Sequence, residues 1–458
     1  MTIDASETCH LDEPESGGWF SAIASRISAI ELRFPLASRG LLSIFDQGIY
    51  SGTSFLTAVL IGRATSPDQL GLYYLVLSII LVITGVQEQI VFAPYLVYSK
   101  RRKGRELAEY AGSIWAHNLT VAALAMLGLL LAIVILSIVG RSDFIPGLWA
   151  LFCTAPLILF RQGVRRFTFA SLEFKSVVAL DTAVAAIQLG GLALLIHYHL
   201  LSLFRIFAVM GLACGVACFG WYYLEKPRIQ FVPARILSDW RANWRFGKWA
   251  LRTYVLGNTT PQLMLWLVSA VVGPAATGLF GACNNLIGIS NVFLGGVDNV
   301  LTPQAAHAYA TGGVKDLRRI LLFAGAFFAI TMGSCLLFVL FTGDWLMVFV
   351  FGTHYRGTGA ILIALTASTN MNCVSMLAHN GLWAVDRPRS NFVADVCCMT
   401  VTLIAAALLI HPFGALGAAL ATLAGSTTAA LVRSLTLHRY FEASASEQHA
   451  AVHPALSS

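Results

Sequence analysis

The segments PDQLGLY at 67–73 and PAATGLF at 274–280 place a proline, a glycine and an aromatic residue at the same spacing in two distant parts of the chain. Each segment opens a long apolar run that ends at a proline, Pro94 in the first copy and Pro303 in the second. Other matching residues follow at offsets that drift slowly in one direction, as loop insertions after a tandem duplication would cause. The repeat therefore predicts two homologous halves.

The composition of the 458 residues is that of a membrane protein, because 57% are hydrophobic, only 12% are charged and the mean hydropathy is +0.72. Soluble domains carry about 25% charged residues. A helical span needs roughly 20 mostly apolar residues, and a helix pairs its own backbone groups in lipid. The sequence predicts an all-α integral membrane protein with 12 spans, six in each half, near 41–62, 71–97, 112–138, 147–163, 176–197, 203–224, 247–270, 278–302, 319–341, 358–384, 390–410 and 413–436.

These spans divide the chain into five predicted segments. They are a cytoplasmic segment 1–40, an N-lobe 41–224, a cytoplasmic linker 225–246, a C-lobe 247–438 and a disordered cytoplasmic tail 439–458. Apolar residues at helical spacing within the first segment predict an amphipathic helix in the membrane interface, or else a soluble cap. The linker mixes basic and aromatic residues, which also suits an interfacial helix.

Lysine and arginine decide the predicted orientation. With the N-terminus inside, 25 of the 30 Lys and Arg residues fall on the cytoplasmic side, and such a bias sets the topology of membrane proteins. We expect a multi-pass protein of the plasma (inner) membrane with both termini in the cytoplasm. The net charge of +7 then follows from topology, not from nucleic-acid binding. The nine cysteines show no ligand-like spacing, so neither a metal nor a cofactor is expected.

Charged residues inside a membrane cost about 2.5–3.5 kcal/mol each on insertion scales and are functional candidates by default. Six lie within the predicted spans: Asp46, Glu88, Asp181, Arg252, Asp298 and Asp395. The first two spans of each half hold four of them and also carry polar stripes that include Gln47, Gln262, Asn284, Asn285 and Asn291. These four spans are predicted to line a central hydrated cavity between the lobes.

Structural roles compete with functional ones at these positions. Asp46 or Glu88 can pair with Arg252 as a bridge between the lobes. Asp298 and the asparagines of the same span can be ordinary interhelical hydrogen-bond partners.

Two further aspartates, Asp181 and Asp395, lie about two helical turns from the cytoplasmic bases Lys175 and Arg389. Tethering to those bases is the simpler interpretation, and whether either aspartate is functional stays open. Arg63 is expected to anchor the outer headgroup region.

The sequence contains no Walker loop, dinucleotide fingerprint or His-Glu-x-x-His helix, so any transport would have to draw on an ion, potential or substrate gradient. A family resemblance is carried by turn and helix-packing residues: Asp46, Gln47, Gly48, Ser51, Gly52, Phe55, Gly62, Arg63, Pro67, Gly71, Tyr73, Gly273, Pro274, Gly278, Phe280, Pro303, Phe351, Gly352 and Tyr355. On these residues, over about 38–440, the chain resembles the multidrug, oligosaccharidyl-lipid and polysaccharide (MOP) exporter superfamily. Within it the chain looks like the polysaccharide transporter branch that includes O-antigen flippases.

The resemblance implies two six-helix lobes around a central cavity, as in MATE-like transporters, and no enzymatic activity. It implies a flippase that moves an undecaprenyl-diphosphate-linked oligosaccharide from the cytoplasmic to the outer leaflet, by alternating access, for surface polysaccharide biosynthesis. In this account Arg252 attracts the diphosphate. The sugar hydroxyls form hydrogen bonds with the side-chain amides of Gln47, Gln262, Asn284, Asn285 and Asn291. Asp46, Glu88 or Asp298 then binds the coupling proton or sodium ion.

Two other functions remain open. A cation-coupled multidrug exporter has the same fold, whereas a membrane-embedded glycan polymerase or transferase would need a larger external loop than 342–357. The expected partners are the lipid-linked oligosaccharide, membrane lipid and the coupling ion, together with a polysaccharide polymerase and other assembly proteins.

Overall fold

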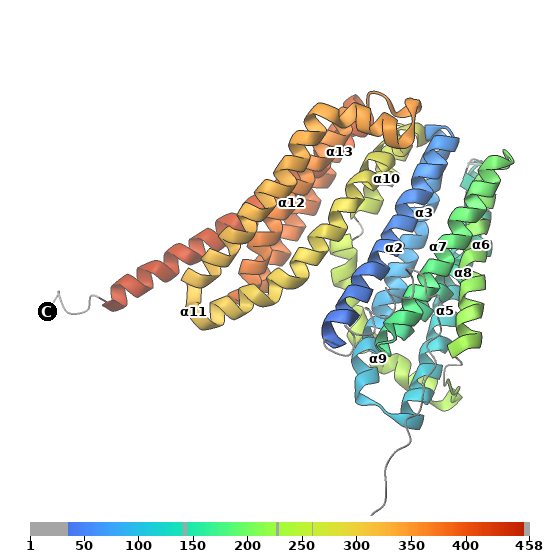
Figure 1. Cartoon of the computed structure of the whole chain (residues 1–458), viewed down its shortest axis with the longest axis horizontal. Coiled ribbons are helices and arrows are strands. Elements are labelled where there is room, and N and C mark those ends of the chain that lie inside the picture. Colours follow the sequence, from blue (N-terminus) through green and yellow to red (C-terminus); the bar gives the residue numbers. More distant parts are fainter. Residues whose placement is uncertain (1–34, 141–143, 226–228, 259, 453–458) are drawn as a thin grey trace, which may run out of the picture.

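The computed structural model describes residues 35–140, 144–225, 229–258 and 260–452, and within them the chain is helical without any strand. Two helical bundles meet at one end of the molecule and diverge toward the other (Figure 1). The amphipathic helix predicted between residues 19 and 34 lies outside the described residues.

The N-lobe consists of the helices before the linker. Its second helix begins where the sequence repeat begins, because Ser66 caps the helix by accepting from the backbone N–H of Gln69 and Pro67 occupies the first turn. The elements are α2 (Pro35–Ala64), α3 (Pro67–Gln87), the π-helix η1 (Glu88–Phe92), α4 (Ala93–Tyr98), the 3₁₀ turn η2 (Ser99–Arg101), α5 (Gly104–Val139), α6 (Ile145–Ala170), α7 (Phe174–His197) and α8 (Leu203–Glu225).

The linker and C-lobe follow as α9 (Pro233–Asn258), α10 (Thr260–Val271), α11 (Pro274–Phe351), the 3₁₀ turn η4 (Thr353–Tyr355), α12 (Gly359–Ala384) and α13 (Pro388–Val452). Two of these helices are bent hairpins. The backbone of α11 reverses at Gly313, where φ is +63°, and that of α13 at Gly414, where φ is +57°. Only glycine adopts such angles without strain, so these two residues divide each long helix into two.

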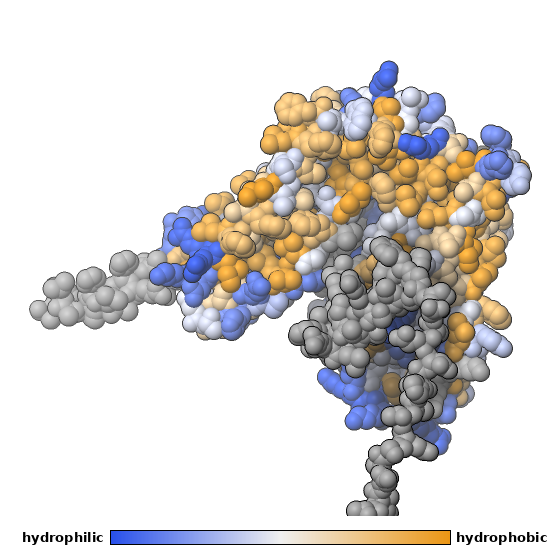
Figure 2. Space-filling model, in the orientation of Figure 1, coloured by the Kyte–Doolittle hydropathy of each residue, from blue (hydrophilic) through white to orange (hydrophobic). Residues whose placement is uncertain are grey.

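Eight helices in the described residues are long and apolar enough to cross a membrane, with α11 and α13 each counted once. Apolar side chains cover the visible flanks of both bundles, and hydrophilic ones gather toward the ends (Figure 2). The all-α membrane architecture is therefore confirmed, whereas the number of 12 spans stays a prediction. Helix α13 reaches Val452, well into the segment 439–458 expected to be disordered. That segment contains five alanines, and alanine has the highest helix propensity.

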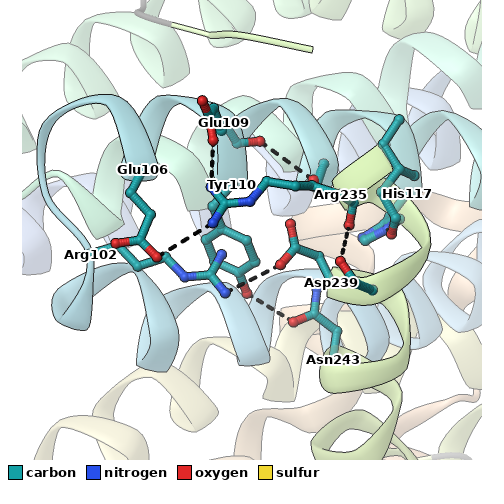
Figure 3. Close-up of polar contacts among 11 residues, drawn as sticks. Arg102, Glu106, Glu109, Tyr110, His117, Arg235, Asp239 and Asn243 are labelled. Carbon is teal, nitrogen blue, oxygen red and sulfur yellow. Dashed lines mark hydrogen bonds and ion pairs between the residues drawn. The ribbon is translucent and has the colours of Figure 1, made fainter. Parts of the chain in front are cut away.

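The linker helix α9 is fastened to the N-lobe by polar contacts with α5 and the turn before it (Figure 3). Arg102 pairs with Asp239 at 3.2 Å, and Arg235 pairs with Glu109 at 2.5 Å. The hydroxyl of Tyr110 donates to the side-chain oxygen of Asn243 at 2.9 Å. These ion pairs and this hydrogen bond connect α9 to the N-lobe.

The two lobes touch at the end that carries both copies of the repeat. Helices α3 and α11 cross so closely that a β-carbon on Gly71 would lie 1.9 Å from the carbonyl oxygen of Pro274. The converse contact is nearly the same, since a β-carbon on Gly278 would lie 2.0 Å from the carbonyl oxygen of Pro67. The crossing is thus symmetric between the halves, and only glycine fits at its centre.

Arg63, at the end of α2, strengthens the same contact. Its Nε donates to the carbonyl oxygen of Val350 at 2.7 Å, and its Nη2 donates to the carbonyl oxygen of Phe349. These are among the last carbonyls of α11, which have no partner within the helix and attract a cation. Arg63, expected to be a headgroup anchor, instead caps a helix of the opposite lobe.

We expect Gly71→Ala to destabilise the protein by about 1–3 kcal/mol, because the added methyl group overlaps the backbone of α11 and must push the lobes apart. Thermal unfolding of the purified protein in detergent measures the effect. Gly190→Ala is the matched control, since a β-carbon there meets nothing within 4 Å. Equal melting temperatures of the two variants would contradict the tight crossing.

Candidate functional site

A cluster of charged side chains lies inside the N-lobe between α2, α6 and α7. Arg165 of α6 bridges two aspartates, with Nη2 at 2.5 Å from Oδ2 of Asp46 and Nε at 2.8 Å from Oδ2 of Asp181. Arg161, one turn earlier on α6, pairs with Oδ1 of Asp181 at 2.6 Å. Both arginines also lie over the ring of Tyr50. The guanidinium carbon of Arg161 is 5.2 Å from the ring centroid, and that of Arg165 is 4.4 Å from it. The cluster therefore ties three helices together.

Glu88 forms a second pair beside this cluster, with Oε2 at 2.7 Å from Nε of Arg166. It opens the π-helix η1, and π-bulges are frequent at functional sites. The neighbouring Gln87 is buried and donates to the carbonyl oxygen of Leu159 at 2.8 Å and to the side-chain oxygen of Asn118. Three carboxylates thus face three guanidinium groups inside one lobe, so the local charges cancel.

These three arginines were not predicted to be partners of the acids. The fourth span was predicted to end at residue 163 and Arg161, Arg165 and Arg166 were counted among the cytoplasmic bases, whereas α6 continues to Ala170. The suggested bridge from Asp46 or Glu88 to Arg252 is wrong, because α6 supplies both partners. Two arginines four residues apart on a helix face one side, which is the signal that could have indicated their role.

The two aspartates suggested to be tethered to Lys175 and Arg389 form ion pairs with other bases. Asp181 pairs with Arg161 and Arg165 as described. Asp395 pairs with Arg433 of the same helix hairpin at 2.6 Å. Arg433 is buried and also donates to the hydroxyl of Ser375 at 2.6 Å. In both lobes the aspartate pairs with an arginine that is farther away in sequence than the predicted base. The two partners meet because the segments that carry them pack side by side within the lobe.

Asp298 on α11 differs from these acids because its carboxylate contacts a neutral side chain. The side-chain amide of Asn380 donates to its Oδ1 at 2.7 Å, and Thr302 donates to the oxygen of the same amide at 2.6 Å. No ion pair involves Asp298 among the described residues. It is half-buried, so a cation can approach it without displacing an arginine.

Two cavities bring together amides of the predicted site. The larger, of about 840 Å³, lies between α2 and both halves of α11 and contains Gln47 from one lobe and Asn291 from the other. The rest of its wall is mainly apolar, with Phe293, Phe323 and Phe327. A cavity of this size and mixed lining is typical of a site for a small molecule or part of a larger amphipathic one.

The smaller cavity, of about 280 Å³, lies within the C-lobe and is lined by hydroxyl and amide groups together with Asp395. It contains Asn284 and again Asn291, which therefore joins the two cavities. Asn285 points elsewhere, because its amide contacts the carbonyl oxygen of Phe55 across the lobe interface at 3.4 Å.

Arg252 and Gln262 are not among the residues that line either cavity. Arg252 is exposed on α9 and stacks on Trp249, with the guanidinium carbon 4.5 Å from the ring centroid. Gln262 is half-buried on α10. Within the described residues no group of three His, Cys, Asp or Glu side chains is arranged to hold a metal ion.

Replacing Arg165 with leucine should destabilise the protein by about 3–5 kcal/mol, because Asp46 is left as a buried unpaired charge. The double variant Arg165→Leu/Asp46→Leu should recover most of that loss, since the remaining Arg161–Asp181 pair is balanced. Thermal unfolding of both variants measures the difference. If the double variant is no more stable than the single one, Asp46 does not depend on Arg165.

Solved structures of the same fold are transporters. The chain matches an inward-facing multidrug resistance MATE family transporter of the MOP superfamily with a TM-score of 0.71 and 13% identity, over 87% of this chain and 95% of that chain. It matches the lipid II flippase MurJ in an inward closed conformation with a TM-score of 0.67 and 12% identity, over 87% of both chains. A MOP superfamily transporter from Pyrococcus furiosus, whose binding pocket has reverse polarity, gives 0.60 and 13%, over 88% and 94%.

No family model matches the sequence, and no curated protein matches it. The identities of 12–13% with the solved structures establish the fold and not the substrate. The predicted MATE-like architecture is confirmed, whereas the O-antigen flippase branch stays a prediction. The chain has the two-lobed fold that MATE transporters share with MurJ within the MOP superfamily.

Proposed function

We propose that the chain is a flippase for a lipid-linked oligosaccharide, carrying an undecaprenyl-diphosphate-linked glycan from the cytoplasmic to the outer leaflet of the inner membrane. The observation that supports this most directly is the cavity between the lobes, which combines amides from both lobes with an apolar wall. A lipid-linked glycan needs both kinds of surface, since its sugars form hydrogen bonds and its chain is apolar. MurJ, which has the same fold, is itself a flippase for a lipid-linked molecule.

The substrate contacts we propose begin at the junction of the two cavities. Gln47 and Asn291 face the same space from opposite lobes, and Asn284 continues the polar lining into the C-lobe. Each amide offers two N–H donors and one acceptor to sugar hydroxyls. Asn285 lies beside Asn284 on α11 and Gln262 lies on α10. Arg252 lies on the linker helix α9, where we assign it to initial attraction of the diphosphate.

We propose Asp298 as the first of the three coupling candidates. Asp46 and Glu88 already neutralise arginines, so a proton or sodium ion bound there has to break an ion pair. Among the described residues the carboxylate of Asp298 accepts only from the amide of Asn380, so a cation can bind to it without breaking an ion pair. Asp46 and Glu88 remain coupling candidates in which ion binding would free a guanidinium group.

A cation-coupled multidrug exporter is the second candidate. The observation in its favour is that the same carboxylate, Asp298, has no basic partner among the described residues and is therefore able to attract a cationic drug. The MATE transporter with a TM-score of 0.71 is a multidrug resistance protein.

Cells that lack the chain but retain the neighbouring glycan genes should accumulate lipid-linked oligosaccharide on the cytoplasmic leaflet. Wild-type protein should relieve the accumulation, and Gln47→Ala/Asn291→Ala should restore at most about one tenth of the flux, since buried sugar hydroxyls lose their partners. Enzymatic cleavage of the glycan in inside-out vesicles measures the pool. Gln69→Ala, exposed at the start of α3, is the control. Absence of any accumulation, together with sensitivity to cationic drugs, would favour the exporter instead.

Asp298→Asn should make transport independent of the imposed ion gradient, because the amide keeps the hydrogen bond to Asn380 and loses the charge. Flux in proteoliposomes is measured with a proton gradient, a sodium gradient and neither. Asp68→Asn, exposed in the first turn of α3, should leave the gradient dependence unchanged. A normal response of the Asp298 variant to both gradients would remove this residue from the coupling mechanism.

A further inference from the structure

Helix α9 has two faces of different chemistry, and only one is used for packing on the N-lobe. The packed face includes Arg235, Asp239 and Asn243, which contact α5 and the turn before it (Figure 3). Gly247 continues this face, since a β-carbon there would lie 3.0 Å from the carbonyl oxygen of Gln89. Ion pairs and hydrogen bonds thus lie on the buried side of the helix.

The opposite face carries a row of basic residues. Arg241, Arg245, Lys248 and Arg252 follow one another at intervals of four, three and four residues, which aligns them along one side of a helix. The arginines are exposed and the lysine is half-buried. In the described part of the chain no carboxylate pairs with any of them, and Lys248 and Arg252 contact the ring of Trp249. We call these four residues the basic stripe.

Apolar side chains border the basic stripe on both sides. Leu237, Trp244 and Val255 are exposed along one edge, and Trp249 is exposed along the other. Tryptophan is enriched where the polar headgroups of a membrane meet its hydrocarbon. A stripe of cations between exposed indole and aliphatic groups therefore has the composition of a surface that lies on lipid headgroups, and not that of a face in water.

We infer that the basic stripe binds the phosphate groups of anionic phospholipids and so fastens α9, and with it the N-lobe, to one leaflet. The stripe extends about 16 Å along the helix axis, so its four cations can face several neighbouring headgroups at once. Basic clusters of this kind are attracted to anionic leaflets. The packed face holds the stripe in a fixed orientation, which an isolated amphipathic helix would lack. This inference does not depend on the proposed substrate.

The test uses the full-length protein in mixed micelles of phosphatidylcholine and phosphatidylglycerol, with native mass spectrometry to count retained lipids. Wild-type protein should retain phosphatidylglycerol preferentially, and less of it at high salt. Arg241→Gln/Arg245→Gln/Lys248→Gln should weaken this retention at least about tenfold. The matched control is Lys315→Gln/Arg318→Gln/Arg319→Gln, which removes three exposed bases between the halves of α11 and should change retention less than about twofold.

Several results would overturn the inference. Equal losses in the two triple variants would show a general effect of net charge. Displacement of phosphatidylglycerol by inorganic pyrophosphate would assign the stripe to a soluble diphosphate. A tenfold rise in retention after Asp12→Asn/Glu13→Gln/Glu15→Gln would indicate that the acidic N-terminal segment occupies the stripe. If the stripe variant does not fold, the salt dependence of the wild-type protein is the deciding measurement. Phosphatidylglycerol retention that does not fall at high salt would contradict the inference.

Discussion

The close crossing of α3 and α11 is the contact on which the arrangement of the lobes depends. Two glycines, one from each half, let the backbones touch, and Arg63 adds hydrogen bonds from α2 to the end of α11. The contact is confined to one end of the molecule, so the lobes can diverge toward the other end without breaking it (Figure 1). Small residues let the backbones of two membrane helices approach closely, so the position of one lobe relative to the other depends on these two glycines.

The two lobes differ in the partners of their acidic side chains. In the N-lobe each of three acids has an arginine of α6, so the polar interior is an ion-pair network that joins helices. In the C-lobe Asp298 contacts an amide, and the hydroxyl-lined cavity reaches the lobe interface through Asn291. Among the described residues the N-lobe cluster thus pairs all its acids with arginines, whereas the C-lobe combines one ion pair, between Asp395 and Arg433, with the carboxylate of Asp298, which contacts an amide.

The sequence predicted the features that depend on local pattern. The repeated proline and glycine at 67–71 and 274–278 indicated two halves, and the same residues form the lobe contact. Contacts between residues that are far apart in sequence but close in space were not predicted. The partners of Asp46 and Asp181 come from a helix whose end was placed too early, because three arginines in an apolar segment resemble a cytoplasmic loop. The cap formed by Arg63 joins residues almost 290 positions apart, which no spacing rule can detect.

The balance of charge inside the N-lobe also affects how the protein responds to voltage. One elementary charge that crosses the membrane potential gains or loses about 2.3 kcal/mol per 100 mV. Asp46, Glu88 and Asp181 move together with Arg161, Arg165 and Arg166, because short ion pairs join them. Their sum is zero, so the cluster carries no gating charge when the lobe tilts. The membrane potential therefore does no net work on this cluster when its members move together.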